Sequence, residues 1–508
     1  MLSEDPRTAT RPEHPPRTPL VALGAWLADR GAEPDLLGDA GVEVTGVSLS
    51  SRRILPGDLY AALPGARAHG ADFAADALAA GAVAVLTDPG GVVRLPAGTP
   101  VLVVVDPRRW LGGPSAEAYG HPAAALAMIG VTGTQGKTTT SRLAEGGLAR
   151  AGVSSAVIGT IGTRISGVDV QTALTTPEAP DLHGLFAVMR ERGTAACAME
   201  VSSHALVLGR VDGVCFDVAV FTNLGRDHLD FHTDVEDYYQ AKAALFTPER
   251  ARLALVNLDD EHGRRLAVDA QVPVRTYAVG GSDADWRAVE VELTAAGSRF
   301  VVHGPGDLAV EAGCPLPGDF NVANTLAAIA ACAEAGFDAA RVATGIARGG
   351  GVPGRLERVE AGQGFSVVVD YAHKPDAVEA AIRTLRPLTA GRVIVVLGAG
   401  GDRDPGKRPL MGEIAARAAD LLVVTDDNPR SEDPAAIRRE VLAGAADAGE
   451  SVEIGDRRAA IRHALALAAD GDVVLIAGKG HESGQEIAGV VHPFDDREVA
   501  RQELGGLR

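Results

Sequence analysis

The sequence predicts an α/β protein with three domains. The chain has 508 residues, which at roughly 150 residues per domain is enough for about three. Short apolar runs alternate with Ala-rich stretches of helical spacing, the pattern of parallel strands joined by crossover helices. The apolar runs include residues 82–88, 126–133, 216–224, 252–260, 365–372, 392–400, 420–428 and 472–480. Because these runs end in Gly, Asp or Asn, we expect ligands to bind at the carboxyl ends of the strands.

Two segments rich in Gly and Pro predict the domain boundaries. Residues 111–125 precede a new strand, and residues 349–355 separate a helical stretch from another series of strands. The polar, Pro-rich N-terminus has no apolar core of a signal peptide, so we expect it to be a disordered tail. The expected ranges are 1–18 for the tail and 19–122, 123–352 and 353–508 for the domains.

Composition and charge exclude several classes of function. Lys and Arg total 48 against 67 Asp and Glu, a formal charge of −19 that disfavours nucleic-acid binding. The chain has no apolar run long enough to span a membrane. The cysteines, none in Cys-x-x-Cys spacing, are Cys197, Cys215, Cys314 and Cys332. They indicate neither a zinc site nor a disulfide framework, and they favour a reducing, cytoplasmic setting.

The strongest local signal is a phosphate-binding loop over residues 129–139. A strand runs into a Gly-rich turn, after which Lys137 and Thr138 open a helix. Such a turn lets backbone N–H groups converge on phosphate oxygens at the helix N-terminus. Lys137 would reach the terminal phosphates and the Thr138 hydroxyl would bind Mg²⁺. Val131 stands where the strict pattern has Gly, so this is a variant loop.

Further candidates for metal chemistry follow the next strands. Glu200 ends a predicted strand, where a carboxylate can hold Mg²⁺ opposite the phosphate loop. His228 and His232 are four residues apart, which is open to three interpretations: a zinc pair, one histidine in a magnesium shell, or structural histidines. Lys242 lies in a helical stretch with apolar flanks and is by itself an ordinary surface lysine.

Five segments, in this order along the chain, resemble the Mur ligase family: residues 132–139, 200–206, 222–232, 238–246 and 320–328. Members are ATP-dependent enzymes that build the peptide stem of peptidoglycan precursors. The resemblance implies an N-terminal α/β UDP-binding domain, a central P-loop-type parallel-sheet ATPase domain and a C-terminal Rossmann-like α/β domain. It extends over essentially the whole chain after the predicted tail.

The resemblance assigns catalytic and nucleotide-binding residues. Lys137 would bind the ATP phosphates, and Thr138, Glu200 and His228 would hold Mg²⁺. Lys242 matches the family lysine that reacts with CO₂ to form a carbamate (N6-carboxylysine), which would help to hold a second metal ion. That reaction needs a neutral amine, so the site must disfavour the charged form. The expected ATP-binding residues are Gly133, Thr134, Gln135, Gly136, Lys137, Thr138, Thr139, Asn321, Asn324, Arg355, Asp370 and His373.

The N-terminal segments 51–59 and 69–73 resemble the MurE type within this family, which adds the third residue of the stem. This implies that the substrate is UDP-MurNAc-L-Ala-D-Glu. The residues matching its binding positions are Ser51, Arg52, His69, Thr175, Thr176, Ser202 and Arg210. Gln135 departs from the Asn of many members, and Leu174 and Leu208 replace polar residues found in some relatives.

The Asp-Asn-Pro-Arg sequence at residues 427–430 indicates which amino acid is added. It matches enzymes that add meso-2,6-diaminopimelate, whereas alone it would be an ordinary turn. Diaminopimelate differs from lysine by one more carboxylate, which the guanidinium of Arg430 would bind bidentately. With lysine bound, the positive charge of the Arg430 guanidinium would have no carboxylate to pair with. The expected diaminopimelate-binding residues are Arg403, Asp427, Asn428, Arg430, Gly478 and Glu482.

Taken together, the sequence predicts a cytoplasmic, monomeric enzyme. It would join meso-2,6-diaminopimelate to the D-Glu of its substrate through an acyl phosphate, using ATP and Mg²⁺, and so serve cell-wall biogenesis, cell shape and cell division. Ligation of L-lysine and a folylpolyglutamate synthase-like ligase are alternatives, as are a P-loop motor or switch ATPase and a non-catalytic precursor-binding protein. Residues 397–404 carry Arg403 where a dinucleotide loop needs Gly, which argues against a nicotinamide cofactor.

Overall fold

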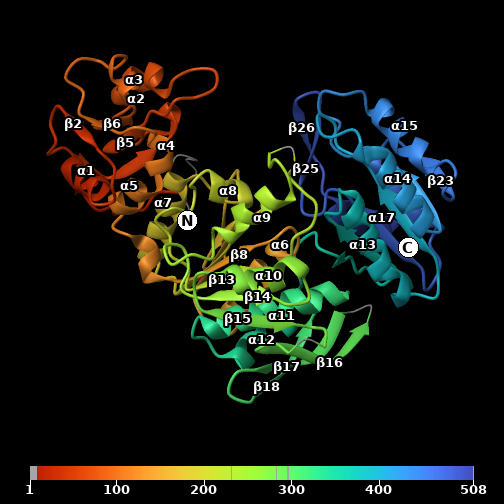
Figure 1. Cartoon of the computed structure of the whole chain (residues 1–508). Helices are drawn as coiled ribbons and strands as arrows, with labels where there is room; N and C mark the ends of the chain where they lie inside the picture. Colours follow the sequence, from red (N-terminus) through yellow and green to blue (C-terminus); the bar gives the residue numbers. More distant parts are fainter. Residues whose placement is uncertain (1–7, 230, 282, 295–296, 507–508) are drawn as a thin grey trace. The chain divides into compact units, whose positions relative to one another are not determined.

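The computed structural model describes residues 8–229, 231–281, 283–294 and 297–506. The chain divides into two compact units. The first contains the described residues up to Val289 together with Val302–Glu311 and Ala323–Ile346. The second contains those from Ala347 onward together with Glu290–Val301 and Ala312–Val322. Each unit is built on parallel sheets with helices against their faces (Figure 1).

The N-terminal part of the first unit is a five-stranded sheet in the order β2-β7-β6-β5-β4. Its strands are β2 (Asp35–Leu37), β4 (Gly46–Ser48), β5 (Asp58–Ala61), β6 (Ala84–Thr87) and β7 (Val101–Val103). All neighbours are parallel except β2 and β7. The accompanying helices are α1 (Leu20–Ala28), α2 (Ala74–Ala79), α3 (Pro89–Val92), α4 (Pro107–Trp110) and α5 (Gly112–Ala118). A short pair, β1 (Thr18–Pro19) and β3 (Glu43–Val44), completes this part.

The central sheet has 11 strands in the order β11-β10-β9-β12-β8-β13-β14-β15-β16-β17-β18. Its parallel strands are β8 (Ala127–Thr132), β9 (Ser155–Gly159), β12 (Ala196–Glu200), β13 (Val218–Phe221), β14 (Ala254–Asn257) and β15 (Val274–Ala278). The outer strands are β10 (Gly162–Ile165), β11 (Val168–Val170), β16 (Trp286–Thr294), β17 (Gly297–Gly304) and β18 (Leu308–Cys314). Every residue of β9 and β12 is buried, as expected for strands covered on both faces.

The helices of this part follow the strands along the chain. They are α6 (Lys137–Arg150), α7 (Ala179–Glu191), α8 (Ser203–Val207), α9 (Val235–Ala243), α10 (Glu261–Asp269), α11 (Asp319–Glu334) and α12 (Ala339–Ala347). The core includes Met128, Ile158, Leu185, Phe216 and Phe221. The loops that enter α6, α8 and α9 therefore leave the carboxyl ends of neighbouring parallel strands, where such sheets bind ligands.

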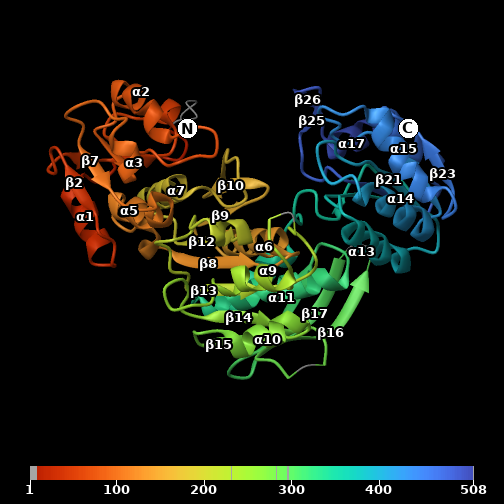
Figure 2. The same cartoon turned by 45° about the horizontal axis from the view of Figure 1, so that its top comes forward.

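The second unit contains a six-stranded sheet in the order β19-β20-β24-β21-β22-β23, parallel except for β19. Its strands are β19 (Glu357–Arg358), β20 (Ser366–Asp370), β21 (Val393–Leu397), β22 (Leu421–Val424), β23 (Ser451–Glu453) and β24 (Val473–Ala477). Alternate strand residues pack into two separate cores, one with α13 (Pro375–Leu385), α14 (Lys407–Ala418) and α15 (Pro434–Ala445), the other with α16 (Arg457–Leu467) and α17 (Asp496–Gly506). Figure 2 shows α13, α14, α15 and α17 beside the strands of this sheet. A hairpin of β25 (Gly484–Ile487) and β26 (Val490–Pro493) lies beside residue 430.

The predicted α/β class with parallel sheets is confirmed. The N-terminal sheet and strands β8 to β15 of the central sheet lie in the first unit, whereas β16, β17 and β18 are divided between the two units. The three domain ranges stay predictions. No helix within the described part of the chain is long and apolar enough to cross a membrane.

For residues 8–18, the structure corrects the prediction of a disordered tail over residues 1–18. Residues 1–7 lie outside the described residues. From residue 8 onward the chain is packed: Thr10 is buried, the Arg11 side chain is only 7% exposed, and β1 begins at Thr18. Composition indicated a tail because it counts polar residues. It cannot show that these residues pair with other parts of the folded chain.

Candidate active site

The predicted phosphate loop joins β8 to α6. Gly133 (φ +146°) and Gly136 (φ +87°) have backbone angles that favour glycine, and a Cβ on either would overlap a neighbouring side chain. Lys137 opens α6, and its Nζ donates to the carbonyl oxygens of Gly133 (2.8 Å) and Thr134 (3.0 Å). The loop thus wraps around the Lys137 amine at a helix N-terminus, an arrangement suited to binding an anion.

The segment after β13 holds this loop in place. The backbone N–H of Thr134 donates to the Asn223 carbonyl oxygen (2.9 Å), and that of Gln135 donates to Asn223 Oδ1 (2.9 Å). The Thr222 hydroxyl donates to the Gln135 carbonyl oxygen (2.6 Å). Sequence reasoning did not assign a role to Thr222 or Asn223. Their position at the end of a predicted strand beside the loop strand was the available signal.

Lys242 of α9 lies against the same loop. Its side chain is buried, and Nζ donates to the Gly133 carbonyl oxygen (2.8 Å) and lies 4.5 Å from the centre of the Tyr238 ring. Burial, and then the nearby charge of Lys137, hold the pKa of the Lys242 amine well below its usual value. The environment therefore favours the neutral amine that carbamate formation requires. The sequence alone described this residue as a surface lysine.

Glu200 ends β12, beside the strand that leads into the phosphate loop. Its carboxylate is buried and accepts hydrogen bonds from the backbone N–H (2.8 Å) and the hydroxyl (3.1 Å) of Thr160. A Cβ on Gly159 would overlap this carboxylate, so glycine provides the space. A buried carboxylate at this edge is a suitable oxygen ligand for Mg²⁺.

His228 has a left-handed backbone (φ +54°) and lies in an aromatic cluster. Its ring centre is 5.0 Å from that of His204 and 6.0 Å from that of Tyr238. His232 uses Nε2 toward the Ser203 hydroxyl (2.9 Å) and Nδ1 toward the carboxylate of Asp237 (3.3 Å). Because both of its nitrogens are occupied, the structure gives no support to a zinc pair of His228 and His232.

The structure brings the four predicted catalytic residues to the carboxyl ends of β8, β12 and β13. Lys137 and Lys242 meet at one carbonyl oxygen, and Tyr238 lies between Lys242 and His228. Among the residues described, no three His, Cys, Asp or Glu side chains form a ready metal cage. This donor set fits Mg²⁺, which is commonly held by one or two carboxylates together with substrate phosphates. The metal-binding roles stay predictions.

Predicted substrate residues of the central sheet surround the end of β12. The Thr176 hydroxyl donates to the Glu200 carbonyl oxygen (2.9 Å) and accepts from the Ser202 backbone N–H (3.2 Å). Arg210 donates to the Thr176 carbonyl oxygen (3.3 Å) and pairs with Glu178 (2.9 Å). Thr175 also belongs here, since its hydroxyl lies 3.1 Å from that of Thr160.

The N-terminal substrate residues lie in the five-stranded domain. Ser51 and Arg52 form a short 3₁₀ helix with Arg53. His69 uses both ring nitrogens within its own domain, Nδ1 accepting from the Ala71 backbone N–H (3.0 Å) and Nε2 lying 2.9 Å from the Asp88 carboxylate. A hydrogen bond from a His69 ring nitrogen to substrate would therefore compete with one of these bonds.

Asn321 and Asn324, two of the expected ATP-binding residues, fall in different units. In the first, Asn324 lies against Gly136, and its Oδ1 accepts from the Thr140 hydroxyl (3.4 Å). In the second, Asn321 is buried and donates to the Pro317 carbonyl oxygen (2.8 Å). Each position on α11 is thus well defined within its own unit.

Arg355, Asp370 and His373 gather at the end of β20. The Arg355 guanidinium lies 4.7 Å from the centre of the Tyr371 ring, and Asp370 accepts backbone N–H bonds from residues 356 and 372. The Tyr371 carbonyl oxygen lies 2.7 Å from His373 Nδ1. Burial lowers the pKa of His373 to about 4, so this ring is neutral at pH 7.

Asn428 of the Asp-Asn-Pro-Arg sequence belongs to a charged network. Lys479 is fully buried and donates to Asn428 Oδ1 (2.9 Å) and to the carboxylate of Glu482 (3.1 Å). Asn428 in turn donates to Glu482 (2.8 Å). Lys479 was missed at the sequence level, although it stands next to the predicted Gly478.

Asp427 and Arg430 flank this network. Arg430 has φ +52°, donates to the Gly401 carbonyl oxygen (2.7 Å) and lies 3.3 Å from the Glu486 carboxylate. The buried Oδ2 of Asp427 has no hydrogen-bond partner among the described residues, and a Cβ on Gly478 would lie 2.5 Å from it. A buried carboxylate oxygen without a partner indicates a place for a ligand donor.

The last predicted diaminopimelate residue, Arg403, lies in the loop after β21. Its Nη1 donates to the Asp402 carbonyl oxygen (3.4 Å). A Cβ on Gly400 would lie 3.0 Å from Arg430 Nη1 and 4.0 Å from Arg403 Cγ. The structure therefore places all six predicted residues in the second unit, at the carboxyl ends of β21, β22 and β24.

Three family models match the chain. They are the Mur ligase family catalytic domain over residues 43–119, the Mur ligase middle domain over residues 131–332 and the Mur ligase glutamate ligase domain over residues 354–480. The UDP-N-acetylmuramoyl-L-alanyl-D-glutamate--2,6-diaminopimelate ligase of Streptomyces coelicolor is 57% identical, covering 97% of this chain and 98% of its own. The enzyme of the same name from Corynebacterium glutamicum is 49% identical, covering 94% of each chain.

Solved structures give the same result. A UDP-N-acetylmuramoyl-L-alanyl-D-glutamate--2,6-diaminopimelate ligase superposes with a TM-score of 0.68 at 34% identity, covering 95% of this chain and 99% of its own. MurF from Acinetobacter baumannii, at 20% identity and a TM-score of 0.65, shares the fold over 92% of this chain and 96% of its own. The matched models and the near full-length relatives show that the chain belongs to the Mur ligase family.

Proposed function

We propose that the protein is an ATP-dependent ligase that adds meso-2,6-diaminopimelate to the D-Glu of UDP-MurNAc-L-Ala-D-Glu. The observation that carries this proposal is the phosphate loop in which the buried Lys242 amine and the Lys137 amine both donate to the Gly133 carbonyl oxygen. The chain is also similar over nearly its full length to ligases of that name. The enzyme would serve peptidoglycan precursor synthesis and thereby cell-wall biogenesis, cell shape and cell division.

The reaction begins with activation of a carboxylate, which is a poor electrophile. The D-Glu side-chain carboxylate attacks the γ-phosphorus of ATP, giving an acyl phosphate and ADP. Lys137 would turn from the loop carbonyl groups toward the transferring phosphoryl group and balance its charge. The backbone N–H groups at the start of α6 would bind the remaining phosphate oxygens. The neutral amine of diaminopimelate then attacks the acyl carbon, the bond from that carbon to the phosphate oxygen breaks, and in the overall balance the phosphate takes up the proton that the amine loses.

Thr138, Glu200, His228 and carbamylated Lys242 are the residues that would hold Mg²⁺. The metal would supply further positive charge to the phosphoryl group during transfer. Carbamylation joins the neutral Lys242 amine to CO₂ and releases one proton, leaving a carboxylate on Nζ. The lowered pKa of Lys242 supports this role, because the amine needs no strong base to reach its reactive form.

Recognition of diaminopimelate would come from a positive and a negative side chain of the second unit, Arg430 and Asp427, which do not pair with each other. Arg430 would bind the carboxylate that lysine lacks, while the free carboxylate oxygen of Asp427 would accept from a substrate ammonium group. Asn428 and Glu482, held by Lys479, would supply further polar contacts. A site of this kind rejects an analogue that lacks the matching group, because its own buried charge is then unpaired.

The test is formation of ADP and of the amide product with UDP-MurNAc-L-Ala-D-Glu, ATP and each candidate amine in turn. We expect kcat/KM for meso-diaminopimelate to exceed that for L-lysine by on the order of 10⁴-fold. Equal turnover of both amines would refute the specificity, and a preference for a folate substrate would refute the assignment. ADP release that is independent of the UDP-linked acid would instead indicate a motor or switch ATPase.

We also propose that the enzyme works as a monomer in the cytoplasm. Cys197, Cys215 and Cys332 are free thiols, and Cys197 and Cys332 are buried, which suits a reducing compartment.

A further inference from the structure

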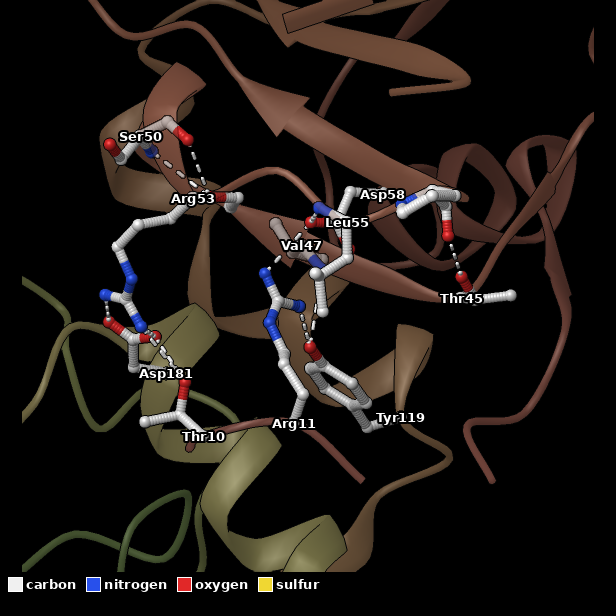
Figure 3. Close-up of polar contacts among 12 residues, drawn as sticks. Thr10, Arg11, Thr45, Val47, Ser50, Arg53, Leu55, Asp58, Tyr119 and Asp181 are labelled. Atoms are coloured by element: carbon white, nitrogen blue, oxygen red, sulfur yellow. Dashed lines mark hydrogen bonds and ion pairs between the residues drawn. The ribbon is translucent and has the colours of Figure 1, made fainter. Parts of the chain in front are cut away.

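Residues 8–14 lie between the N-terminal domain and α7 and bond to both (Figure 3). We name this segment the clasp. On the N-terminal side, Arg11 Nη2 donates to the Asp58 carboxylate (3.1 Å), and Nη1 donates to the Tyr119 hydroxyl. The Asp58 side chain is 3% exposed. A buried, paired guanidinium of this kind fixes the clasp to the N-terminal sheet, since leaving either charge unpaired would be costly.

On the other side, the clasp bonds to both ends of α7. The Thr10 hydroxyl donates to the Asp181 carboxylate (2.8 Å) in the first turn of the helix. In the last turn, the Glu191 carboxylate accepts from the backbone N–H groups of Glu13 (2.8 Å) and His14 (2.7 Å). The clasp therefore lies along the whole length of α7.

Arg53 closes the arrangement from the N-terminal domain. Its Nη1 and Nη2 each donate to one oxygen of Asp181 at 2.9 Å, and Nη2 also donates to the Thr10 hydroxyl (3.2 Å). Figure 3 shows the guanidinium facing the carboxylate, with Thr10 beside them. Bidentate pairs of this geometry fix orientation as well as distance.

Two glycines, one in each domain, make room for the clasp. A Cβ on Gly46 of β4 would overlap the Arg11 guanidinium, and a Cβ on Gly184 of α7 would overlap the Thr10 carbonyl oxygen. Glycine is unfavourable inside a helix, so Gly184 weakens α7 while allowing the close approach of the Thr10 backbone. The place that the clasp occupies is thus formed by both domains.

The pairing of Arg53 with Asp181 lies next to residues that are predicted to bind the substrate. Arg53 directly follows Ser51 and Arg52, and Asp181 lies one turn after the segment 175–178. Ser51 and Arg52 in the first segment, and Thr175 and Thr176 in the second, are predicted to bind the same UDP-linked acid. A ligand that must contact two segments at once binds more tightly when their spacing is set beforehand.

We propose that the clasp and its partner Asp181 hold residues 51–53 at a fixed distance from residues 175–178, which makes Asp181 a positioning residue for the UDP-linked substrate. The identity of that substrate rests on the proposed function, whereas the clasp itself does not. No contact of Asp181 with the reacting atoms is involved.

The kinetic test uses Asp181→Asn and Arg53→Met, with Glu43→Gln as the matched control. Glu43 pairs with Arg17 (3.0 Å), which is also near the N-terminus. This ion pair lies within the N-terminal domain and both side chains are exposed to solvent. We expect the first two variants to raise KM for the UDP-linked acid about tenfold while kcat and KM for ATP change less than about twofold. The control should match the wild type. An unchanged KM for the acid, or an equal rise for ATP, would overturn the positioning role.

A second test follows the clasp without any substrate. In the full-length protein, cleavage by a Glu-specific protease between Glu13 and His14 should be slow, because both backbone N–H groups are bonded to Glu191. Gly184→Ala should expel the clasp and speed this cleavage at least about tenfold, although alanine favours the helix itself. Equally rapid cleavage in the wild type would refute the clasp. Protection in a protein without ligase activity would refute only the proposed function.

Discussion

The phosphate-loop region and the region around Asp427 are built in different ways. At the phosphate loop, the amines of Lys137 and Lys242 donate to the same backbone carbonyl oxygen of Gly133. Around Asp427, charged side chains bond mostly to one another, and one buried carboxylate oxygen has no partner within the described chain. We infer that the backbone of the first region holds its two amines in place before substrate binds, whereas the second region offers a carboxylate oxygen that a ligand would pair. Changes in the first should affect turnover, and changes in the second should affect affinity and the choice of amine.

The largest expected effect is that of Lys242→Ala. Loss of the amine removes the carbamate and thus a ligand of Mg²⁺, so we expect kcat to fall on the order of 10³-fold. Binding of the UDP-linked acid, measured by calorimetry, should survive. Gln240→Ala, an exposed position on the same helix, is the control and should leave turnover unchanged. Normal turnover of Lys242→Ala would show that no carbamate is needed.

Arg430→Ala tests the second region. The variant leaves the extra carboxylate of diaminopimelate without its guanidinium, so KM for that amine should rise about 30-fold or more while KM for ATP is unchanged. Arg439→Ala provides the control, because Arg439 is exposed and only 3.8 Å from Asp433 at its nearest. An unaltered KM for diaminopimelate in Arg430→Ala would contradict the specificity argument.

Gly478→Ala should have an intermediate effect. The added methyl group would lie 2.5 Å from Asp427 Oδ2 and block the oxygen that is expected to accept from the substrate, so we expect KM for diaminopimelate to rise about tenfold. Gly489→Ala also places alanine at a positive φ (+78°, against +118° at Gly478) but meets no atom within 4 Å. If both variants behave alike, backbone strain rather than the blocked oxygen is responsible.

The smallest effect on activity is expected from the titration of two buried histidines, one in each unit, because it acts on the stability of the fold. Burial lowers the pKa of His183 and of His373 from 6.5 to about 4. Between these values the unfolded chain binds a proton that the folded chain does not, so the free energy of unfolding should fall as the pH falls, by on the order of 3 kcal/mol per histidine. Urea unfolding of wild type and His183→Asn at pH 7 and pH 4.5 measures this. An equal loss in both proteins would exclude His183 as a contributor.

Local patterns predicted much of the candidate site because phosphate loops and strand ends depend on short segments. The turn at residues 133–136 needs glycine backbone angles, and the sequence shows those glycines directly. By contrast, Lys242 gained its role in the sequence only from the family resemblance. Its low pKa depends on burial against Gly133, more than 100 residues away in the chain.

The supporting residues were harder to predict. Asn223, Thr160 and Lys479 each hold a predicted residue in place through hydrogen bonds with partners on other elements. No periodicity or motif reports such pairs, because hydrogen-bond partners are chosen by three-dimensional proximity. The same reason explains why the N-terminal segment was predicted wrongly. In the sequence Arg11 is one more polar residue, and only the fold brings it to Asp58 and Tyr119.

By itself, the amino-acid sequence determined the α/β class, the phosphate loop and the position of the Asp-Asn-Pro-Arg turn, because hydrophobic period, glycine and proline act over a few residues. Only the tertiary structure decided which amine has its pKa lowered by burial, which carboxylate oxygen has no partner among the described residues and which segment holds α7 to the N-terminal domain. These properties arise from desolvation and from contacts between distant segments, and neither exists until the chain has folded.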